Sequence, residues 1–260
     1  MQSSLFSQIV FGPIHSRRLG TSLGVNLLPA FGKWCNFNCI YCECGWNDHA
    51  SGDRHLPLQQ EVVQALEKKL VELAHTMDLP DVITFSGNGE PTLHPHFKPI
   101  IKETLALRNQ YAPNAKVCVL SNATQLNHYD VFEALTLVDK PILKIDSAFP
   151  ETLQKINQPV GNYNLDRIIV EMKRFHRNFA LQTLFLRGFY NGSHIDNTTQ
   201  SELKAWLDLV MELKPIEVMI YTIDRKTPAQ EIEKVSVDEL EEIGERIKLI
   251  STDIQVNIAG

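Results

Sequence analysis

Apolar residues along the chain follow two different periodicities. Between residues 57 and 75, leucine, valine and alanine recur every three or four positions, which predicts an amphipathic helix. Residues 82–85 and 116–120 are instead short runs rich in β-branched side chains, which are typical of strands. Both patterns recur to the C-terminus. The predicted strands are 23–30, 82–85, 116–120, 141–146, 180–187, 216–223 and 253–258, and the predicted helices are 57–75, 97–107, 126–137, 153–157, 165–175, 198–213 and 237–249.

This alternation of strands and helices indicates parallel βαβ units, because each helix returns the chain to begin the next strand in the same direction. The pattern contains about six such units and a terminal strand, fewer than the eight units of a closed barrel. We therefore expect an α/β fold, a partial (βα)6 barrel. The sequence shows no internal repeat, low-complexity tract or linker, so residues 1–260 are expected to form one domain.

Composition and charge narrow the class of protein further. Apolar residues make up 43% of the 260 residues and charged residues 22%, as in globular proteins, which excludes wholesale disorder. The net charge of −6 argues against broad nonspecific nucleic-acid binding but is compatible with a local basic site. No apolar stretch approaches about 18 residues, so we expect no membrane helix. The N-terminus lacks the pattern of a signal peptide, and we expect a cytoplasmic protein.

The five cysteines are unevenly distributed, since four of them lie between residues 35 and 44. In a reducing compartment, clustered cysteines usually mark a metal or redox site. Cys35, Cys39 and Cys42 have the spacing C-x3-C-x2-C. Three thiolates can hold three corners of an iron–sulfur cube and leave the fourth iron open to a ligand. Cys118 alternates with valines in a predicted strand and is interpreted as a core residue, whereas Cys44 is either structural or in contact with the substrate.

Two alternatives remain for the three cysteines. Their spacing also places them on one face of a helix, where they would be small core hydrophobes. However, the asparagines and glycines of residues 32–45 favour a loop. The second alternative is a zinc site with Cys44 or a histidine as fourth ligand. Structural zinc sites usually have a second, separate pair of ligands, and His94 and His96 are only two residues apart.

Polar residues follow several predicted strands, at the end where parallel α/β folds bind ligands. Residues 86–91 (SGNGEP) contain Glu90, whose carboxylate can accept hydrogen bonds from an ammonium group; the alternative is an ordinary turn. Asn88 is expected to tolerate a left-handed backbone in this turn. Ser121 and Asn122 follow the next strand and either bind a ribose or carboxylate or cap a helix.

Two further strands end in charged residues. Lys144 and Asp146 are expected on the same face of their strand because strand side chains alternate. They lie near a ligand if this face points into the barrel, and otherwise form a solvated edge or a structural ion pair. Arg187 ends the strand of residues 180–187, and its planar guanidinium suits a carboxylate or phosphate. Arg17, Arg18 and Lys33 are candidate phosphate contacts or simply a solvated basic turn.

The cysteine motif, with Tyr41 directly before the last cysteine, resembles the cluster loop of the radical S-adenosylmethionine (SAM) superfamily. The resemblance implies that Cys35, Cys39 and Cys42 bind a [4Fe-4S] cluster, that SAM chelates its open iron, and that Tyr41 packs near the adenine. Gly89, Glu90 and Pro91 match the G-G-E-P-like motif that holds the amino group of SAM in this family, with Asn88 in place of the first glycine. The other residues expected at the cofactor are Ser121, Asn122, Asp146 and Arg187.

The same resemblance implies an activity. A flavodoxin or ferredoxin would supply one electron, SAM would be cleaved to methionine and a 5′-deoxyadenosyl radical, and the radical would remove hydrogen from a substrate. Residues 11–20 (FGPIHSRRLG) and 151–159 (ETLQKINQP) are similar to iron–sulfur oxidoreductases related to the tRNA wybutosine-synthesising enzymes. Those enzymes carry additional upstream cysteines, and no cysteine precedes Cys35. The expected substrate is a tRNA base or another nucleoside-like molecule; the alternatives are a glycyl-radical activase acting on a partner protein and a non-catalytic zinc module.

Overall fold

The computed structural model describes residues 5–16, 18–47 and 55–260. The chain divides into two compact units. Unit 1 comprises Met1–Cys35 and Asn47–Pro141, and unit 2 comprises Asn36–Trp46 and Ile142–Gly260. The expectation that residues 1–260 form one domain stays a prediction, and the two units are described separately.

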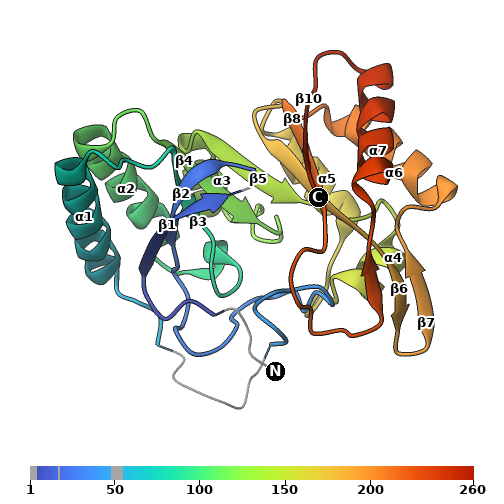
Figure 1. Cartoon of the computed structure of the whole chain (residues 1–260), viewed down its shortest axis with the longest axis horizontal. Coiled ribbons are helices and arrows are strands. Elements are labelled where there is room, and N and C mark those ends of the chain that lie inside the picture. Colours follow the sequence, from blue (N-terminus) through green and yellow to red (C-terminus); the bar gives the residue numbers. More distant parts are fainter. Residues whose placement is uncertain (1–4, 17, 48–54) are drawn as a thin grey trace. The chain divides into compact units, whose positions relative to one another are not determined.

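Unit 1 is built on parallel strands preceded by one antiparallel strand. β1 (Val10–Ser16) pairs antiparallel with β2 (Gly20–Val25), and β2, β3 (Val82–Phe85) and β4 (Lys116–Ser121) are successive parallel neighbours. Its helices are α1 (Gln59–Thr76), the short 3-10 helix η1 (Pro91–Leu93), α2 (Phe97–Tyr111) and α3 (Tyr129–Leu137). Figure 1 shows α1 and α2 side by side, and the two helices are in contact.

Helix α1 illustrates how the apolar pattern is used. The Glu61 side chain accepts a hydrogen bond from the backbone N–H of Leu58, which satisfies a donor at the helix start and places a negative charge near the positive end of the helix dipole. The helix ends at Thr76, and Met77, which caps it, adopts a left-handed conformation with φ 61°. Its buried face is made of residues three or four apart, as predicted: Val62, Leu66, Leu70 and Leu73.

Unit 2 repeats the parallel arrangement. β5 (Lys140–Lys144), whose first two residues still belong to unit 1, is followed by β6 (Ala180–Tyr190), β8 (Glu217–Thr222) and β10 (Gln255–Ala259), which are parallel neighbours in this order. Two short strands, β7 (Ser193–Asp196) and β9 (Ile232–Lys234), pair antiparallel with the end of β6. The helices are α4 (Pro150–Ile156), α5 (Leu165–Lys173), α6 (Gln200–Leu213) and α7 (Val237–Ile250).

Part of the core of unit 2 lies between β6 and α6. Trp206 is buried and contacts the Phe185 ring edge to face, with ring centroids 5.2 Å apart. Its indole N–H donates to Thr183 Oγ1 at 3.0 Å, so the buried polar atom is satisfied. This packing fixes α6 against the strand that carries Arg187.

The alternating βα order and the parallel pairing are confirmed, but several boundaries differ. The predicted strand 23–30 was too late: β2 ends at Val25, and residues 26–30 form a loop. β1 was missed because Gly12–Pro13 and a register shift between Phe11 and Ile14 interrupt its alternation. β7 and β9 were missed because they are short and polar, and only pairing with β6 makes them strands. Among the described residues, no helix has both the length and the apolar content to cross a membrane.

Candidate functional site

In unit 1, the segment before Cys35 is paired with the turn that follows β3. Trp34 N–H donates to the Asn88 carbonyl at 2.8 Å, and Glu90 N–H donates to the Trp34 carbonyl at 3.1 Å. Gly89, with φ 145°, lies so close that a Cβ atom there would be 1.9 Å from the Trp34 oxygen. This position therefore requires glycine. The close approach holds the cysteine next to Trp34 beside the start of the Glu90 turn.

Glu90 is a buried carboxylate surrounded by hydrogen-bond donors. Its Oε1 accepts bonds from Ser121 Oγ at 2.9 Å, Thr92 N–H at 3.1 Å and the Thr92 hydroxyl, and its Oε2 accepts from Asn122 N–H at 2.7 Å. Burial raises the pKa of the Glu90 carboxyl, and these hydrogen bonds partly oppose the rise. In the described part of unit 1, no lysine or arginine pairs with it. A buried carboxylate without a counter-cation fits a cationic ligand such as the ammonium group of SAM.

Asn88 plays a different part from the one expected. Its backbone is not left-handed; the positive φ angles of this turn belong to Gly87 and Gly89. Instead, the buried amide bonds two distant segments. Its Nδ2 donates to the carbonyls of Phe6 and Pro29, both at 2.8 Å, and its Oδ1 accepts from Phe6 N–H at 2.8 Å. The departure from glycine at this position thus supplies a structural cross-link and leaves the turn intact.

Residues 121–124 do not cap a helix, because α3 begins only at Tyr129. They form a turn in which Ala123 has φ 64° and its N–H donates to Ser121 Oγ at 3.1 Å. The turn presents two groups to Glu90, as described above, and it also approaches the cysteine loop. Asn122 Nδ2 lies 3.8 Å from Cys35 Sγ. Unit 1 thus gathers six predicted site residues after β2, β3 and β4: Cys35, Gly89, Glu90, Pro91, Ser121 and Asn122.

In unit 2, Tyr41 and Asp146 form the centre of a buried network. The Tyr41 hydroxyl donates to Asp146 Oδ2, and Leu184 N–H donates to Asp146 Oδ1 at 2.9 Å. Lys144 Nζ lies 3.0 Å from Asp146 Oδ1 and donates to the Tyr221 hydroxyl at 2.8 Å. The two side chains do lie together, but β5 ends at Lys144 and Asp146 follows it, so they do not share a strand as predicted; they form the buried ion pair that was the alternative. Asp146 orients the tyrosine that lies between two of the cysteines.

In this network, Tyr41 stays neutral and Lys144 stays positively charged. Burial, followed by the negative charge of Asp146, raises the pKa of Tyr41 well above its usual range, so the hydroxyl keeps its proton. Burial alone would lower the pKa of Lys144, but the Asp146 carboxylate raises it, so the lysine stays an ammonium. Its Nζ also lies 4.9 Å from the centroid of the Tyr41 ring and 5.0 Å from that of Tyr221.

The cysteine loop is held by the end of α4. Asn38 N–H donates to the Asn157 carbonyl at 2.9 Å, and Ile40 N–H donates to the Ile156 carbonyl at 2.9 Å. Residues 35–46 form turns and contain no helix, so the interpretation of the cysteines as one face of a helix is wrong. Cys39 is buried, while Cys35 and Cys42 are partly exposed. Exposed thiols on an irregular loop suit ligation better than core packing.

Arg187 lies apart from this network. Its guanidinium donates to Thr198 Oγ1 at 2.8 Å and forms ion pairs with Glu239 and Asp196. Hydrogen bonding to Glu239 raises the pKa of Arg187. The planar donor group thus already contacts two carboxylates of unit 2, and its predicted contact with the cofactor stays a prediction.

The two remaining cysteines differ in environment. Cys44 is partly exposed in the loop, whereas Cys118 is buried in β4, as predicted.

In the described ranges, no three histidine, cysteine or acidic side chains are gathered around the position of one metal ion. In an iron–sulfur cube each thiolate binds a different iron, so the three sulfurs need not surround a single ion. Whether the residues suit a cluster and SAM therefore depends on the kind of ligand atoms and on the charge of Glu90. The three thiols are ligands of the kind that an iron–sulfur cluster takes, and the Glu90 carboxylate is an acceptor of the kind that an ammonium group takes; that they bind a cluster and SAM stays a prediction.

Sequence reasoning missed two residues of the site. Thr92 donates twice to Glu90, and the residue after Pro91 carried no signal of this role. Asn157 donates to Tyr41, Asp146 and Cys39. It lies within residues 151–159, which carried the family resemblance, but nothing in that stretch indicated these contacts. Both contacts depend on tertiary structure.

The structure thus defines a protein of the α/β class, built of parallel βα units, with a three-cysteine loop after its first parallel strand. The family model of the Radical SAM superfamily matches residues 30–201, more than half of the chain, and the chain belongs to this superfamily. It is therefore a radical SAM enzyme, and a [4Fe-4S] cluster and SAM are its cofactors.

Two curated relatives of this chain are named UPF0026 proteins. The UPF0026 protein slr1464 of Synechocystis sp. is 35% identical over 226 residues, which cover 85% of this chain and 77% of the relative. A UPF0026 protein of Helicobacter pylori is 29% identical over 235 residues, which cover 89% of this chain and 71% of the relative. These names assign no substrate.

Solved structures show the same fold. The matches include a radical SAM methyltransferase from Sphaerobacter thermophilus (TM-score 0.68, 12% identity, 92% of this chain and 66% of that chain) and archaeal TYW1 (0.53, 12%, 92% and 74%). They also include Streptococcus suis SuiB bound to its precursor peptide SuiA (0.62, 15%, 88% and 47%) and SuiB bound to SAM (0.60, 13%, 91% and 46%). The predicted fold class, a partial (βα)6 barrel of the radical SAM type, is confirmed. The chain spans about half to three quarters of these solved chains.

Proposed function

We propose that this enzyme removes a hydrogen atom from a nucleoside-like substrate, a base within tRNA. When bound, the reduced cluster and SAM supply a 5′-deoxyadenosyl radical for this purpose. The observation that carries the proposed site is the buried Glu90 carboxylate, which has no cationic partner in the described residues and lies in the turn paired with the segment before Cys35. The family's cofactor brings the cation that this site lacks.

Each group of residues has a distinct task in this proposal. Cys35, Cys39 and Cys42 bind the cluster. Glu90 accepts hydrogen bonds from the ammonium group of SAM, and the donors from Ser121, Asn122 and Thr92 hold its carboxylate in place. Because this carboxylate is preorganised and shielded from water, the ammonium is bound without reorganisation at the site.

Tyr41, Asp146 and Arg187 of unit 2 are the other residues proposed to act at the cofactor. Tyr41 packs against the adenine, and Asp146 fixes the tyrosine through its hydroxyl. Arg187 is proposed to lie at the cofactor while it keeps its contact with Glu239. The electron comes from a flavodoxin or ferredoxin. A reducing cytoplasm is the proposed compartment, since it would preserve the thiols of the loop.

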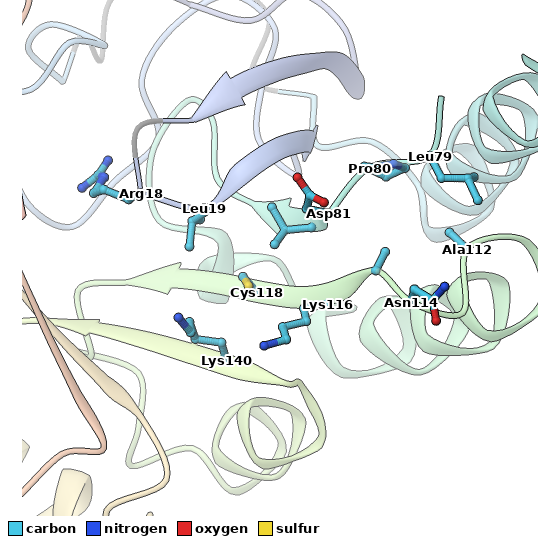
Figure 2. Close-up of a pocket in the computed structure, with 12 residues that line it drawn as sticks. Arg18, Leu19, Leu79, Pro80, Asp81, Ala112, Asn114, Lys116, Cys118 and Lys140 are labelled. Atoms are coloured by element: carbon cyan, nitrogen blue, oxygen red, sulfur yellow. The ribbon is translucent and has the colours of Figure 1, made fainter. Parts of the chain in front are cut away.

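A basic pocket in unit 1 supports an RNA substrate. Arg18, Lys116 and Lys140 line a cavity of about 460 Å³ at the amino ends of β3 and β4, and Asp81 is the one acidic residue among the described residues that line it (Figure 2). Several cations around one cavity in a chain of net charge −6 favour an anionic ligand, and RNA phosphates are such anions. The pocket lies at the opposite end of these strands from Glu90, and a tRNA is large enough to contact both ends. Arg17, also proposed as a phosphate contact, lies outside the described residues.

The similarity of residues 11–20 and 151–159 to the wybutosine-related enzymes and the fold shared with archaeal TYW1 also support this substrate class. A protein substrate is the second candidate, with the chain acting as a glycyl-radical activase. It is favoured by the shared fold with SuiB, which binds a precursor peptide.

Anaerobic reconstitution tests the proposal. The full chain is loaded with iron and sulfide, reduced, and incubated with SAM; the expected products are methionine and 5′-deoxyadenosine. A variant with all three cysteines changed to alanine is the control and should remain colourless and inactive. Deuterated tRNA should then transfer deuterium to 5′-deoxyadenosine. A colourless wild-type protein that binds zinc would overturn the chemistry, whereas transfer only from a co-purifying protein would overturn the RNA substrate.

A further inference from the structure

One buried side chain contacts a cysteine of the loop and has no part in the function proposed above. Asn157, at the C-terminal end of α4, is 1% exposed, and its Nδ2 lies 3.4 Å from Cys39 Sγ. Its backbone is fixed on both sides: its N–H donates to the Leu153 carbonyl at 2.8 Å, and its carbonyl accepts from Asn38 N–H at 2.9 Å. Asn157 and Cys39 both belong to unit 2.

The orientation of the amide is determined by its neighbours. Nδ2 also lies 2.6 Å from Asp146 Oδ2 and 3.0 Å from the Tyr41 hydroxyl oxygen. The reversed amide would place its oxygen against the Asp146 carboxylate, which repels it. In the orientation present, Oδ1 is buried and has no hydrogen-bond partner among the described residues. An unpaired buried acceptor is costly, so the structure retains Asn157 for its donors.

The two hydrogens of the amide serve three acceptors. One hydrogen is directed to Asp146 Oδ2, the shortest of the three contacts. The other lies between the Tyr41 hydroxyl oxygen and Cys39 Sγ. A thiol sulfur is a weak acceptor, but a thiolate bound to iron carries negative charge and accepts more strongly. Cluster binding therefore shifts this second hydrogen toward sulfur.

Hydrogen bonds to ligand sulfurs are one of the means by which proteins set the potential of an iron–sulfur cluster. An N–H dipole with its positive end toward sulfur stabilises the cluster more after it gains an electron than before. The bond therefore raises the reduction potential and makes the cluster easier to reduce. Since Asn157 is held by α4, by Asp146 and by the cysteine loop, its dipole is fixed before the electron arrives.

We propose that Asn157 is a positioning residue that donates an N–H···S hydrogen bond to the Cys39 thiolate and so raises the reduction potential of the cluster. This inference rests on the function proposed above, because it requires Cys39 to be a cluster ligand. It adds that the reduction potential of the cluster depends on a residue at the end of α4, which lies more than a hundred positions along the sequence from the cysteine it contacts.

The test uses the full chain with its cluster reconstituted. Asn157→Leu keeps a similar volume but removes the donor. In a redox titration followed by electron paramagnetic resonance, the ratio of reduced to oxidised cluster at a fixed ambient potential should fall about tenfold, equivalent to a shift of about 59 mV to more negative potential. Ile156→Val is the matched control: it alters packing on the same helix, leaves the amide in place and should not change the potential.

A second measurement keeps the proposal testable if Asn157→Leu does not fold. The chain is labelled with asparagine that carries ¹⁵N only in its side-chain amide, so that the backbone nitrogens of Asn36 and Asn38 give no signal, and it carries Asn122→Ala, which removes the amide 3.8 Å from Cys35 Sγ. Electron–nuclear double resonance of the reduced cluster should detect a coupled ¹⁵N and an exchangeable proton. Their absence, or an unchanged potential in folded Asn157→Leu, overturns the inference. If wild-type protein assembles no cluster, the proposed function has failed instead.

Discussion

At the scale of single residues, the site combines groups that lower the stability of the folded protein unless a ligand or a required geometry compensates for them. Glu90 is buried, and nothing positive offsets its charge in the described residues. Gly89 is fixed at a backbone angle that other residues rarely adopt, against the Trp34 carbonyl. Such features reduce stability and persist where a ligand or a required geometry compensates for them. Each can be tested by a single substitution.

Glu90→Gln should separate stability from cofactor binding. Because the folded-state pKa of Glu90 is raised, its carboxylate lowers stability once the pH rises above the ordinary glutamate pKa. The neutral variant lacks this pH-dependent loss, although its amide nitrogen must face the N–H of Thr92 or Asn122. Without SAM, its melting temperature should therefore fall less than that of wild type as the pH rises above the ordinary glutamate pKa. It should bind SAM about 10–100-fold more weakly, since a charged hydrogen bond contributes about 1.5–3 kcal/mol.

Differential scanning fluorimetry and isothermal calorimetry would check both parts. Glu103→Gln, on the exposed face of α2, is the control and should change neither quantity. In wild-type protein, SAM binding should weaken as the pH falls through the raised pKa of Glu90, because the protonated carboxyl no longer attracts the ammonium. Wild-type affinity for SAM in Glu90→Gln would contradict the assignment.

Gly89→Ala should be strongly destabilising. Its new methyl group would meet the Trp34 carbonyl at 1.9 Å, and its φ of 145° is strained for alanine. We expect a loss of more than about 3 kcal/mol in urea unfolding. Gly161→Ala is a matched control: its φ is also positive, at 86°, but nothing lies within 4 Å of the new methyl group. The control should lose only about 1 kcal/mol. Equal losses would show that the close approach to Trp34 is unimportant.

At the scale of elements, the site depends on which strand or helix carries each group. The C-x3-C-x2-C spacing and the polar residues after three strands were visible in the sequence, and their placement on a loop and in turns agrees with that pattern. The donor from α4 was not predictable. Asn157 and Cys39 are 118 positions apart, and no local periodicity reports such a contact. For the same reason β7 and β9, which exist through pairing with β6, were missed.

The element that carries a cysteine should decide its role. Cys39 belongs to the loop, and Cys118 lies in the middle of β4 with its side chain in the core. Cys39→Ala should abolish cluster assembly, whereas Cys118→Ala should retain full iron and lose about 1 kcal/mol of stability for the smaller core side chain. Iron content and the visible spectrum after anaerobic reconstitution are the measurements. Equal iron retention in the two variants would exclude Cys39 as a ligand.

At the scale of the whole molecule, the sequence indicated the class of fold but not its division. The βα order and the parallel pairing follow from alternating periodicities, and the superfamily fold agrees with them. The division into two compact units has no signature in composition, because no linker or change in charge marks residues 35–36, 46–47 or 141–142. The boundary reflects the density of long-range contacts, which a single sequence does not display.

The substrate proposal makes its prediction at this largest scale. If Lys116 and Lys140 contact RNA phosphates, each bound cation releases counterions, and the logarithm of the binding constant falls with the logarithm of the salt concentration by about 0.7–0.9 per contact. Lys116→Ala with Lys140→Ala should therefore weaken tRNA binding at low salt and reduce this slope by about 1.5. Fluorescence anisotropy with labelled tRNA across a salt series provides the measurement.

Lys68→Ala with Lys204→Ala is the control for that series, since both lysines lie on helices, α1 and α6, outside this pocket. The control removes the same net charge, so a slope that changes equally in both double variants would indicate a general effect of charge and contradict a phosphate site. The pocket variant should still form 5′-deoxyadenosine from SAM in the absence of RNA, because the pocket lies at the amino ends of β3 and β4 while Glu90 follows the carboxyl end of β3. Loss of RNA affinity with retained SAM cleavage would thus separate the part of the molecule that recognises the substrate from the part that generates the radical.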